Sequence, residues 1–286
     1  MVGRNFRELL EAQWDAGRFL CVGLDSDFEK IPEAARTSDI EQTFVAFNRA
    51  IVDATRDLVC AYKPNSAFYE ARGDEGLKAL RQTIQYIHEV APEVPVILDA
   101  KRADIGNTNA GYVDAAFDYL RADAITVHPY MGAESLAPFF ERKDKGIFVL
   151  CRTSNPGAGE LQDLKVDGSS LGLGTNEPLY KIVAHLIAKK WNTNHNCFAF
   201  VGATYPNELG EVRSIVGDEP ILTAGVGAQN GDLARCIQAG KNVRNKGIII
   251  NASRLVIFAS SGKNFAEVAA AKAQQLHGEI RAALLK

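Results

Sequence analysis

The sequence predicts an α/β protein, a (β/α)8 TIM barrel formed by a single domain that spans residues 1–286. Eight short apolar runs alternate along the chain with longer, more polar stretches. Near-continuous apolar runs are typical of parallel strands buried on both faces, and their alternation with helical stretches indicates repeated strand–helix units. The length suits one barrel, and no Pro/Ser-rich linker or fixed-period repeat divides the chain. A doubly wound open sheet is the alternative.

The expected strands are apolar runs of four to six residues. They are Phe19–Leu24, Val59–Lys63, Val94–Asp99, Ala124–His128, Gly146–Cys151, Cys197–Gly202, Pro220–Ala224 and Gly247–Ile250. The stretches between them are long enough for the helices that cover a parallel sheet. Helices are expected at Ile40–Asp57, Glu75–Glu89, Asn109–Arg121, Glu177–Trp191, Pro206–Ile215, Asp232–Ala239 and Asn264–Leu285.

The composition is that of a globular protein with a sizeable core, with 47% hydrophobic and 23% charged residues. The net charge of −3 and the pI of about 6.0 provide no basic field that would recruit nucleic acid or anionic lipid. An anionic substrate would therefore need a local cluster of donors.

The five cysteines are scattered and form no C-x-x-C pair, which argues against a disulfide framework or a zinc ribbon. The first residues, 1–11, carry four charged side chains and lack the apolar core of a signal peptide. No apolar run is long enough to span a membrane. We expect a soluble cytoplasmic protein.

Polar side chains lie at or just past the carboxyl ends of six predicted strands. In a barrel, catalytic groups gather on this face. Charges that simply enter solvent would explain two or three such positions, but not six. The positions are Asp25, Lys63, Asp99, His128, Arg152 and Thr204.

The stretch that follows the third predicted strand carries the strongest chemical signal. Strand alternation places Asp99 and Lys101 on one face, and Lys63 at the end of the preceding strand can meet them. Together with Asp104, two carboxylates and two ammoniums would form a fixed, ionised array. Such an array offers a positioned N–H as a proton donor for a carbanion, beside a carboxylate that would repel a substrate carboxylate.

Three other uses of this cluster are possible. A Schiff base is disfavoured, because a lysine flanked by carboxylates keeps its proton and is a poor nucleophile. A metal site is disfavoured, because the lysine already supplies the positive charge that a cation would bring. A structural salt-bridge cluster is the third reading, and the placement at a strand end beside a second lysine weighs against it.

Two loops predict substrate contacts. Residues 224–232 form a Gly-rich loop after the seventh strand, and Arg254 follows the eighth, where such barrels bind phosphate. The alternative is a tight turn and a surface arginine that bind no ligand. Residues 151–175 lack periodicity and resemble a binding loop or lid, with Ser154 suited to an amide or pyrimidine edge. A disordered insertion is the alternative there.

These motifs together resemble the orotidine 5′-phosphate decarboxylase family, in particular its longer bacterial branch. The matching segments lie in the family's order over nearly the whole chain, with D-x-K-x-x-D as the most specific. They are Gly23-Leu24-Asp25, Lys63-Pro64-Asn65, residues 99–108, Pro129-Tyr130-Met131-Gly132, residues 151–157, Val201-Gly202-Ala203-Thr204, residues 225–229 and Ser253-Arg254.

The resemblance implies decarboxylation of orotidine 5′-phosphate to UMP, the last step of pyrimidine nucleotide synthesis, without metal or organic cofactor. It implies that Lys101 donates a proton to C6 of the pyrimidine and that Asp99 faces the substrate carboxylate. Lys63 would link the network to the ribose. Asp104 would come from the partner subunit of a homodimer, and Ile105 and Thr108 would lie beside it.

The remaining contacts implied by the resemblance bind the substrate's polar groups. They are Asp25 for the ribose hydroxyls, Ser154 for the pyrimidine, and Gly227, Gln229 and Arg254 for the phosphate.

Two other functions compete with this one. Related barrels that act on sugar phosphates share D-x-K-x-x-D but use Mg²⁺; the second lysine, Lys63, and the Arg-Thr-Ser-Asn loop favour the pyrimidine substrate. A non-catalytic nucleotide-binding barrel is the other, and it would not need a carboxylate such as Asp99 near an anionic ligand.

Overall fold

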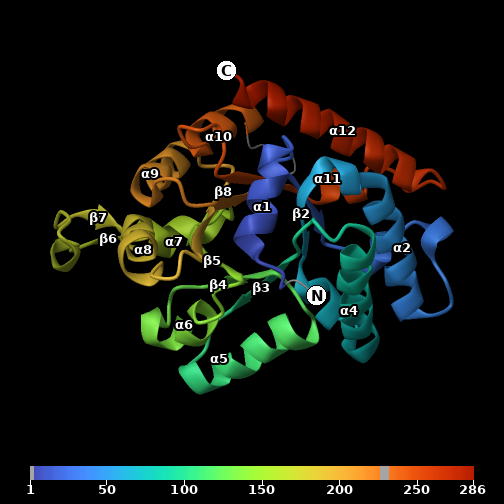
Figure 1. Cartoon of the computed structure of the whole chain (residues 1–286), viewed down its shortest axis with the longest axis horizontal. Helices are drawn as coiled ribbons and strands as arrows, with labels where there is room; N and C mark the ends of the chain where they lie inside the picture. The colour runs from blue at the N-terminus through green and yellow to red at the C-terminus, as the bar shows by residue number, and fades with distance from the viewer. Residues whose placement is uncertain (1–2, 226–231) are drawn as a thin grey trace.

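The computed structural model describes residues 3–225 and 232–286 and shows the predicted barrel (Figure 1). Eight parallel strands form one sheet in the order β2-β1-β10-β9-β8-β5-β4-β3. Bridges from Tyr62 to Val96 and from Asn65 to Asp99 join the two end strands, so the sheet closes on itself. The strands are β1 (Leu20–Leu24), β2 (Val59–Pro64), β3 (Ile97–Arg102), β4 (Ala124–Val127), β5 (Gly146–Arg152), β8 (Cys197–Gly202), β9 (Ile221–Ala224) and β10 (Ile248–Ala252).

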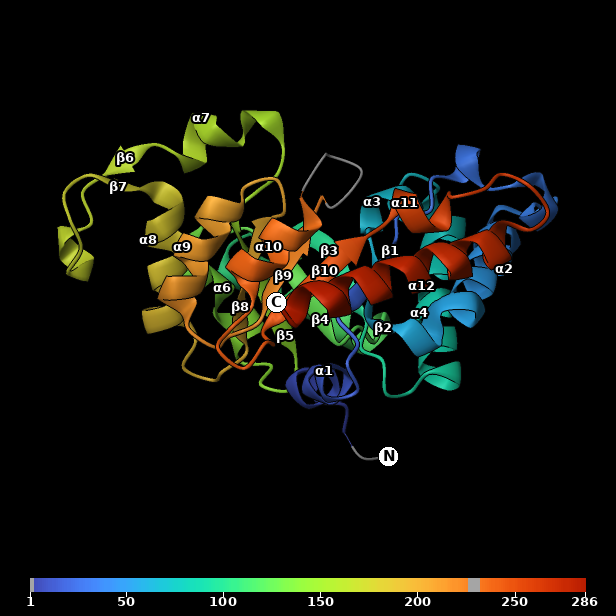
Figure 2. The same cartoon turned by 90° about the horizontal axis from the view of Figure 1, so that it is seen from above.

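Helices surround the strands, and a short antiparallel pair, β6 (Lys165–Val166) and β7 (Glu177–Pro178), projects beyond them (Figures 1 and 2). The helices are α1 (Phe6–Asp15), α2 (Ile40–Thr55), α3 (Ser66–Glu70), α4 (Gly73–Val90), α5 (Gly106–Val113), α6 (Gly132–Phe140), α7 (Gly159–Gln162), α8 (Leu179–Leu186), α9 (Pro206–Val216), α10 (Leu233–Gly240), α11 (Arg254–Ile257) and α12 (Phe265–Leu284). Among the described residues, no helix is both long and apolar enough to cross a membrane.

The strands are buried as their apolar sequences predict, and every residue of β1, β2, β4, β8 and β10 is buried. One face of each strand packs inside the barrel and the other packs against the helices, so neither face needs polar residues. The five cysteines are free and buried and behave as small core residues.

Several boundaries differ from the sequence predictions. The third strand begins at Ile97, because Val96 forms only a single bridge, and it continues to Arg102, which pairs with Val127 after a register shift at residues 99–101. The helix expected from Glu177 begins at Leu179, since residues 177–178 pair with β6. The predictions lacked α1, α3, α6, α7 and α11. Helix α6 contains Pro138 in its interior, a residue that helices usually exclude.

Helix α1 covers the amino-terminal end of the barrel, opposite α3, α7 and α11 (Figure 2). Phe6 is buried against the rings of Phe148 and Phe198, with centroid distances of 5.5 and 5.9 Å. Arg4, just before the helix, donates to both carboxylate oxygens of Asp123 at 2.8 and 2.9 Å. The helix thus closes the bottom of the barrel with an aromatic plug and a buried ion pair.

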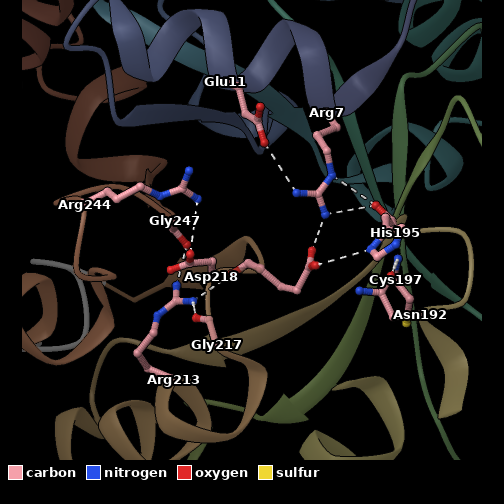
Figure 3. A network of polar contacts seen from close by, with 11 residues as sticks. Arg7, Glu11, Asn192, His195, Cys197, Arg213, Gly217, Asp218, Arg244 and Gly247 are labelled. Atoms are coloured by element: carbon pink, nitrogen blue, oxygen red, sulfur yellow. Dashed lines mark hydrogen bonds and ion pairs between the residues drawn. The ribbon is translucent and has the colours of Figure 1, made fainter. Parts of the chain in front are cut away.

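A second set of polar contacts ties α1 to the loops before β8 and β9 (Figure 3). Arg7 donates twice to the carbonyl of His195 and pairs with Glu219. The nearly buried Arg213 donates to backbone carbonyls only, those of Gly217, Glu219, Gly240 and Gly247. Burial lowers the pKa of Arg213 to about 10, so the guanidinium stays charged at neutral pH. These contacts supply donors to carbonyls of the loops, among them that of Gly247, which also accepts from Ile221 N at 2.8 Å.

The carboxylate of Asp123 supports a prediction about stability and pH. Burial disfavours its charge, but hydrogen bonds from His88 and Arg4 outweigh burial and hold the pKa of Asp123 below its usual value. A depressed folded-state pKa contributes stability above the ordinary value near 4, which is lost as the pH falls through the folded-state value. We expect Asp123→Asn to lower the free energy of unfolding by about 3 kcal/mol or more at pH 7.

Urea unfolding between pH 7 and pH 3 measures both effects. The variant should also lose less stability than wild type on acidification. Asp118→Asn, which breaks an exposed pair with Arg142, is the control and should change stability by less than about 1 kcal/mol. Equal effects of the two substitutions would contradict the role given to Asp123.

Candidate active site

A cavity of about 400 Å³ opens at the carboxyl ends of the strands. These ends of the strands lie on the side of the barrel opposite α1 (Figure 2). Its residues come from the tips of strands or the loops after them, as expected for the catalytic face of such a barrel. They include Asp25, Lys63, Asp99, Lys101, Leu150, Thr153, Ser154, Asn155, Gln162, Phe200, Ala224, Gly225, Asn251, Ser253 and Arg254.

Asp99 is the centre of the charge network. Its Oδ2 accepts from Lys63 Nζ at 2.7 Å and its Oδ1 accepts from Lys101 Nζ at 2.6 Å. Asp25 Oδ1 lies 3.8 Å from Lys63 Nζ. Three strands therefore bring two carboxylates and two ammoniums together, as the sequence predicted for Lys63, Asp99 and Lys101.

The network fixes the charge states of its buried members. Burial opposes the charge of Asp99, but the ammoniums of Lys63 and Lys101 outweigh it and hold the pKa of Asp99 well below its usual value. Burial also opposes the charge of Lys63, yet Asp99 and Asp25 outweigh it and raise the pKa of Lys63 above its usual value. Both groups are therefore ionised at neutral pH.

The two lysines differ in what they can reach. Only 3% of the Lys63 side chain is exposed, whereas 44% of the Lys101 side chain is exposed. Lys101 thus presents a held ammonium to the cavity, while Lys63 forms part of its wall. An exposed, positioned ammonium beside an ionised carboxylate can donate a proton to a carbanion or stabilise developing negative charge.

Two acceptors in the cavity wall have no hydrogen-bond partner within the described part of the chain. Oδ1 of Asp25 and Oδ1 of Asn251 are buried, and neither accepts a hydrogen bond there. Buried acceptors are rarely left unpaired unless a ligand or water completes them. Both suit the hydroxyl groups of a sugar. The sequence signal for Asp25 was its place after a predicted strand. Asn251 directly follows the predicted strand Gly247–Ile250 and was missed.

The loop after β5 has an ordered beginning. Gln162 Oε1 accepts from Thr153 N at 2.8 Å and its Nε2 donates to Thr153 Oγ1 at 2.9 Å, which holds Ser154 at the cavity. The prediction of a binding loop missed α7 and Gln162. Arg152 was predicted to face the cavity region, but it pairs with Asp163 at 2.9 Å and stacks on Tyr205. It anchors the loop instead.

His128 and Thr204 also lie outside the cavity that contains Asp99. His128 lines a neighbouring apolar cavity of about 570 Å³ between α6 and α8. The hydroxyl of Thr204 is buried without a partner among the described residues. Of the six polar strand ends, the cavity therefore gathers Asp25, Lys63 and Asp99.

Other predicted site residues lie away from this chain's network. Asp104 Oδ1 accepts from Ile105 N at 2.7 Å, and neither residue lines the described cavity. Ile105 is 53% exposed, and Thr108 on α5 is also exposed. Arg254 lines the cavity at the start of α11. The predicted phosphate contacts Gly227 and Gln229 lie outside the described residues.

Comparisons with known proteins agree with the geometry. The family model described as "Orotidine 5'-phosphate decarboxylase / HUMPS family" matches residues 18–269. A protein of Cellvibrio japonicus named orotidine 5′-phosphate decarboxylase is 46% identical over 98% of this chain and 99% of its own length. A protein of Herpetosiphon aurantiacus with the same name is 49% identical over 89% of this chain and 90% of its own length.

A solved structure shares the fold over the whole length. The structure of Leishmania donovani OMP decarboxylase has a TM-score of 0.83 and 36% identity, and the match covers 99% of each chain.

Close packing between β8 and the loop that carries Ser154 leads to a prediction about the site. A Cβ on Gly202 would lie 2.6–2.7 Å from Ser154 N, Cα and Cβ, which is too close for any real contact. Gly202→Ala must therefore shift the backbone of Ser154 relative to β8. We expect kcat/KM for orotidine 5′-phosphate to fall by about 10-fold or more, because misplaced contacts of this size cost at least that much.

Gly210→Ala in α9 is the matched control, since its Cβ would meet Ala239 at an ordinary 3.8 Å. It should leave kcat/KM unchanged and raise stability by up to about 1 kcal/mol. Steady-state kinetics and thermal unfolding of the two variants test this. Full activity of Gly202→Ala would show that Ser154 is not held where the reaction needs it.

Proposed function

The chain belongs to the orotidine 5′-phosphate decarboxylase / HUMPS family, and we propose that it is a carboxy-lyase that converts orotidine 5′-phosphate to UMP with no metal or organic cofactor. The observation that carries the proposal is the ionised Lys63–Asp99–Lys101 network at the cavity. It combines a cationic proton donor with a fixed carboxylate, which is what loss of CO₂ followed by protonation requires.

In the proposed reaction, the bond between C6 of the pyrimidine and its carboxyl carbon breaks and CO₂ leaves. The electron pair stays on C6. The Lys101 ammonium stabilises that charge and then transfers one proton from Nζ to C6, and solvent returns a proton to the lysine. Because the charge on C6 develops only as the bond breaks, the lysine acts mainly in the transition state.

Asp99 has two roles in this scheme. It keeps Lys63 charged and holds both Lys63 and Lys101 within hydrogen-bond distance, so that the donor needs little reorganisation. It also lies beside the position proposed for the substrate carboxylate, where repulsion is relieved when neutral CO₂ departs. Stabilisation of the carbanion by Lys101 is the larger contribution in our scheme.

The rest of the cavity supplies the proposed substrate contacts. Asp25 Oδ1, which accepts no hydrogen bond from the described residues, and the adjacent Lys63 would bind the ribose hydroxyls. Ser154 would bind the pyrimidine edge, and Arg254 would bind the phosphate. Gly227 and Gln229 complete the phosphate site in this proposal.

The family name also covers sugar-phosphate enzymes, so the metal requirement is the discriminating test. Within residues 3–225 and 232–286, no group of three His, Cys, Asp or Glu side chains is arranged to hold a metal ion. Ultraviolet absorbance assays of the purified protein with orotidine 5′-phosphate, with and without EDTA, test the proposal. Turnover that persists in EDTA supports it. Activity lost with EDTA favours the Mg²⁺-dependent class, and UMP binding without turnover favours a binding protein.

Replacement of the proton donor gives the second test. We expect Lys101→Ala to abolish decarboxylation while UMP binding stays measurable. Assays of turnover and calorimetry with UMP measure the two effects. Residual turnover above about a tenth of wild type, a barrier change below about 1.4 kcal/mol, would contradict the assignment of Lys101.

We also propose that the working enzyme is a homodimer with shared active sites. Asp104 lies outside its own chain's cavity, and the exposed apolar side chains near it suit burial in a subunit interface. These side chains are Ile105 before α5, and Tyr130 and Met131 before α6, which packs against α5. A two-fold interface would place each Asp104 at the partner's Lys101.

Mixed dimers test this arrangement. Lys101→Ala and Asp104→Ala should each be inactive, but a heterodimer of the two would hold one doubly damaged site and one intact site. With random pairing about half of the dimers are mixed, so activity should recover to roughly a quarter of wild type after dissociation and reassembly. Absence of recovery in a mixture shown to contain heterodimers would place Asp104 in its own subunit's site.

A further inference from the structure

We propose that Thr126, a buried residue of β4, is a positioning residue that sets the reactive geometry of Asp99 and Lys101. The inference rests on the proposed decarboxylase function. Thr126 does not line the cavity, and its side chain is fully buried, so it acts through its two neighbours and not on the substrate.

The Thr126 hydroxyl makes two hydrogen bonds whose directions are fixed. Its Oγ1 accepts from the backbone N of Lys101 at 3.0 Å, because an N–H can only donate. Its single proton is then free to be donated to Asp99 Oδ1, 2.8 Å away. The same Oδ1 accepts from Lys101 Nζ at 2.6 Å. The contacts close a ring that links the main chain of Lys101, the hydroxyl, the carboxylate and the ammonium.

The local backbone shows why a side-chain acceptor is needed there. Leu98 pairs with Ile125 and the next β3–β4 pair is Arg102 with Val127, so residues 99–101 lie opposite Thr126 alone. Lys101 has φ of 49°, in the left-handed region that non-glycine residues rarely adopt. The bulge removes the Lys101 N–H from the regular ladder, and the Thr126 hydroxyl accepts it instead.

This arrangement couples the position of the ammonium to the strand. The bulge and the left-handed turn aim the Lys101 side chain back toward Asp99, and the hydroxyl stabilises both features at once. Valine has nearly the shape of threonine but no hydroxyl. Thr126→Val would leave the Lys101 N–H without its acceptor and Asp99 Oδ1 with one donor fewer, while Lys63 and the substrate contacts remain.

The experiment compares Thr126→Val with Thr126→Ser and with a control, Thr223→Val. Thr223 is a fully buried threonine on β9 whose hydroxyl donates to the Ile249 carbonyl at 2.9 Å, away from the network. For Thr126→Val we expect kcat to fall by about 10- to 100-fold, the range for a lost hydrogen bond to a charged group. KM and the Kd for UMP should change by less than about 3-fold, because Thr126 does not touch the ligand.

The serine variant separates positioning from packing. Thr126→Ser keeps the hydroxyl and loses only a methyl group, so kcat should stay within about 3-fold of wild type, as should that of Thr223→Val. If Thr126→Val does not fold, Thr126→Ala replaces it, because it matches Thr126→Ser in lacking the methyl group and differs only in the hydroxyl.

Each outcome decides the inference. The inference is overturned if Thr126→Val keeps the wild-type kcat. It is also overturned if Thr126→Ser and Thr126→Ala lower kcat by the same factor. A parallel rise in the Kd for UMP would also overturn it, since the residue would then shape the binding site as a whole. Absence of turnover in the wild-type protein would instead overturn the proposed function itself, so the two failures are distinguishable.

Discussion

The burial of Asp99 is the constraint on which the rest of the site depends. A carboxylate that is 5% exposed is tolerated only when its charge is paired and its oxygens are hydrogen-bonded. Here each oxygen accepts from its own lysine, and Oδ1 also accepts from Thr126. The partners come from β2, β3 and β4, so the three strand tips must lie in one register. The same requirement that keeps the buried charge stable therefore positions the groups proposed for catalysis.

The amino-terminal end of the barrel is closed by side-chain contacts that are separate from the cavity. Arg4 and Asp123 pair beneath β4, Phe6 fills the space between β5 and β8, and Arg213 satisfies loop carbonyls near α1. None of these groups lines the cavity described at the carboxyl ends. In barrels, this separation lets one end maintain the fold while the loops at the other end serve the chemistry. The strained Lys101 backbone can be retained because the strands around it are fixed from below.

The sequence predicted the barrel because its strands are buried on both faces and so appear as apolar runs. It also predicted Lys63, Asp99 and Lys101, since charged residues at the ends of such runs must meet at one rim. It could not predict Thr126, because a polar residue inside an apolar run has no distinguishing pattern. Asn251 directly follows the predicted strand Gly247–Ile250 and was overlooked although it had the same signal as Asp25. The bulge at Lys101 could not be predicted either, because the spacing of Lys101 from Asp99 is the same as in a regular strand. Helix α1 was missed although its sequence carries helix signals: Asn5 caps its start, and Phe6, Leu10 and Trp14 recur at helical spacing.

The charge count of the network explains why an additional acid from a partner would matter. Within one chain, Asp25 and Asp99 balance Lys63 and Lys101, so the array is neutral overall. A substrate carboxylate added to a neutral array meets no net repulsion. If Asp104 of the partner subunit joins, the array becomes net negative, and the substrate carboxylate lies in an unfavourable field that vanishes when CO₂ leaves. In the proposed dimer, assembly would therefore set the electrostatics of the reaction as well as complete its residues.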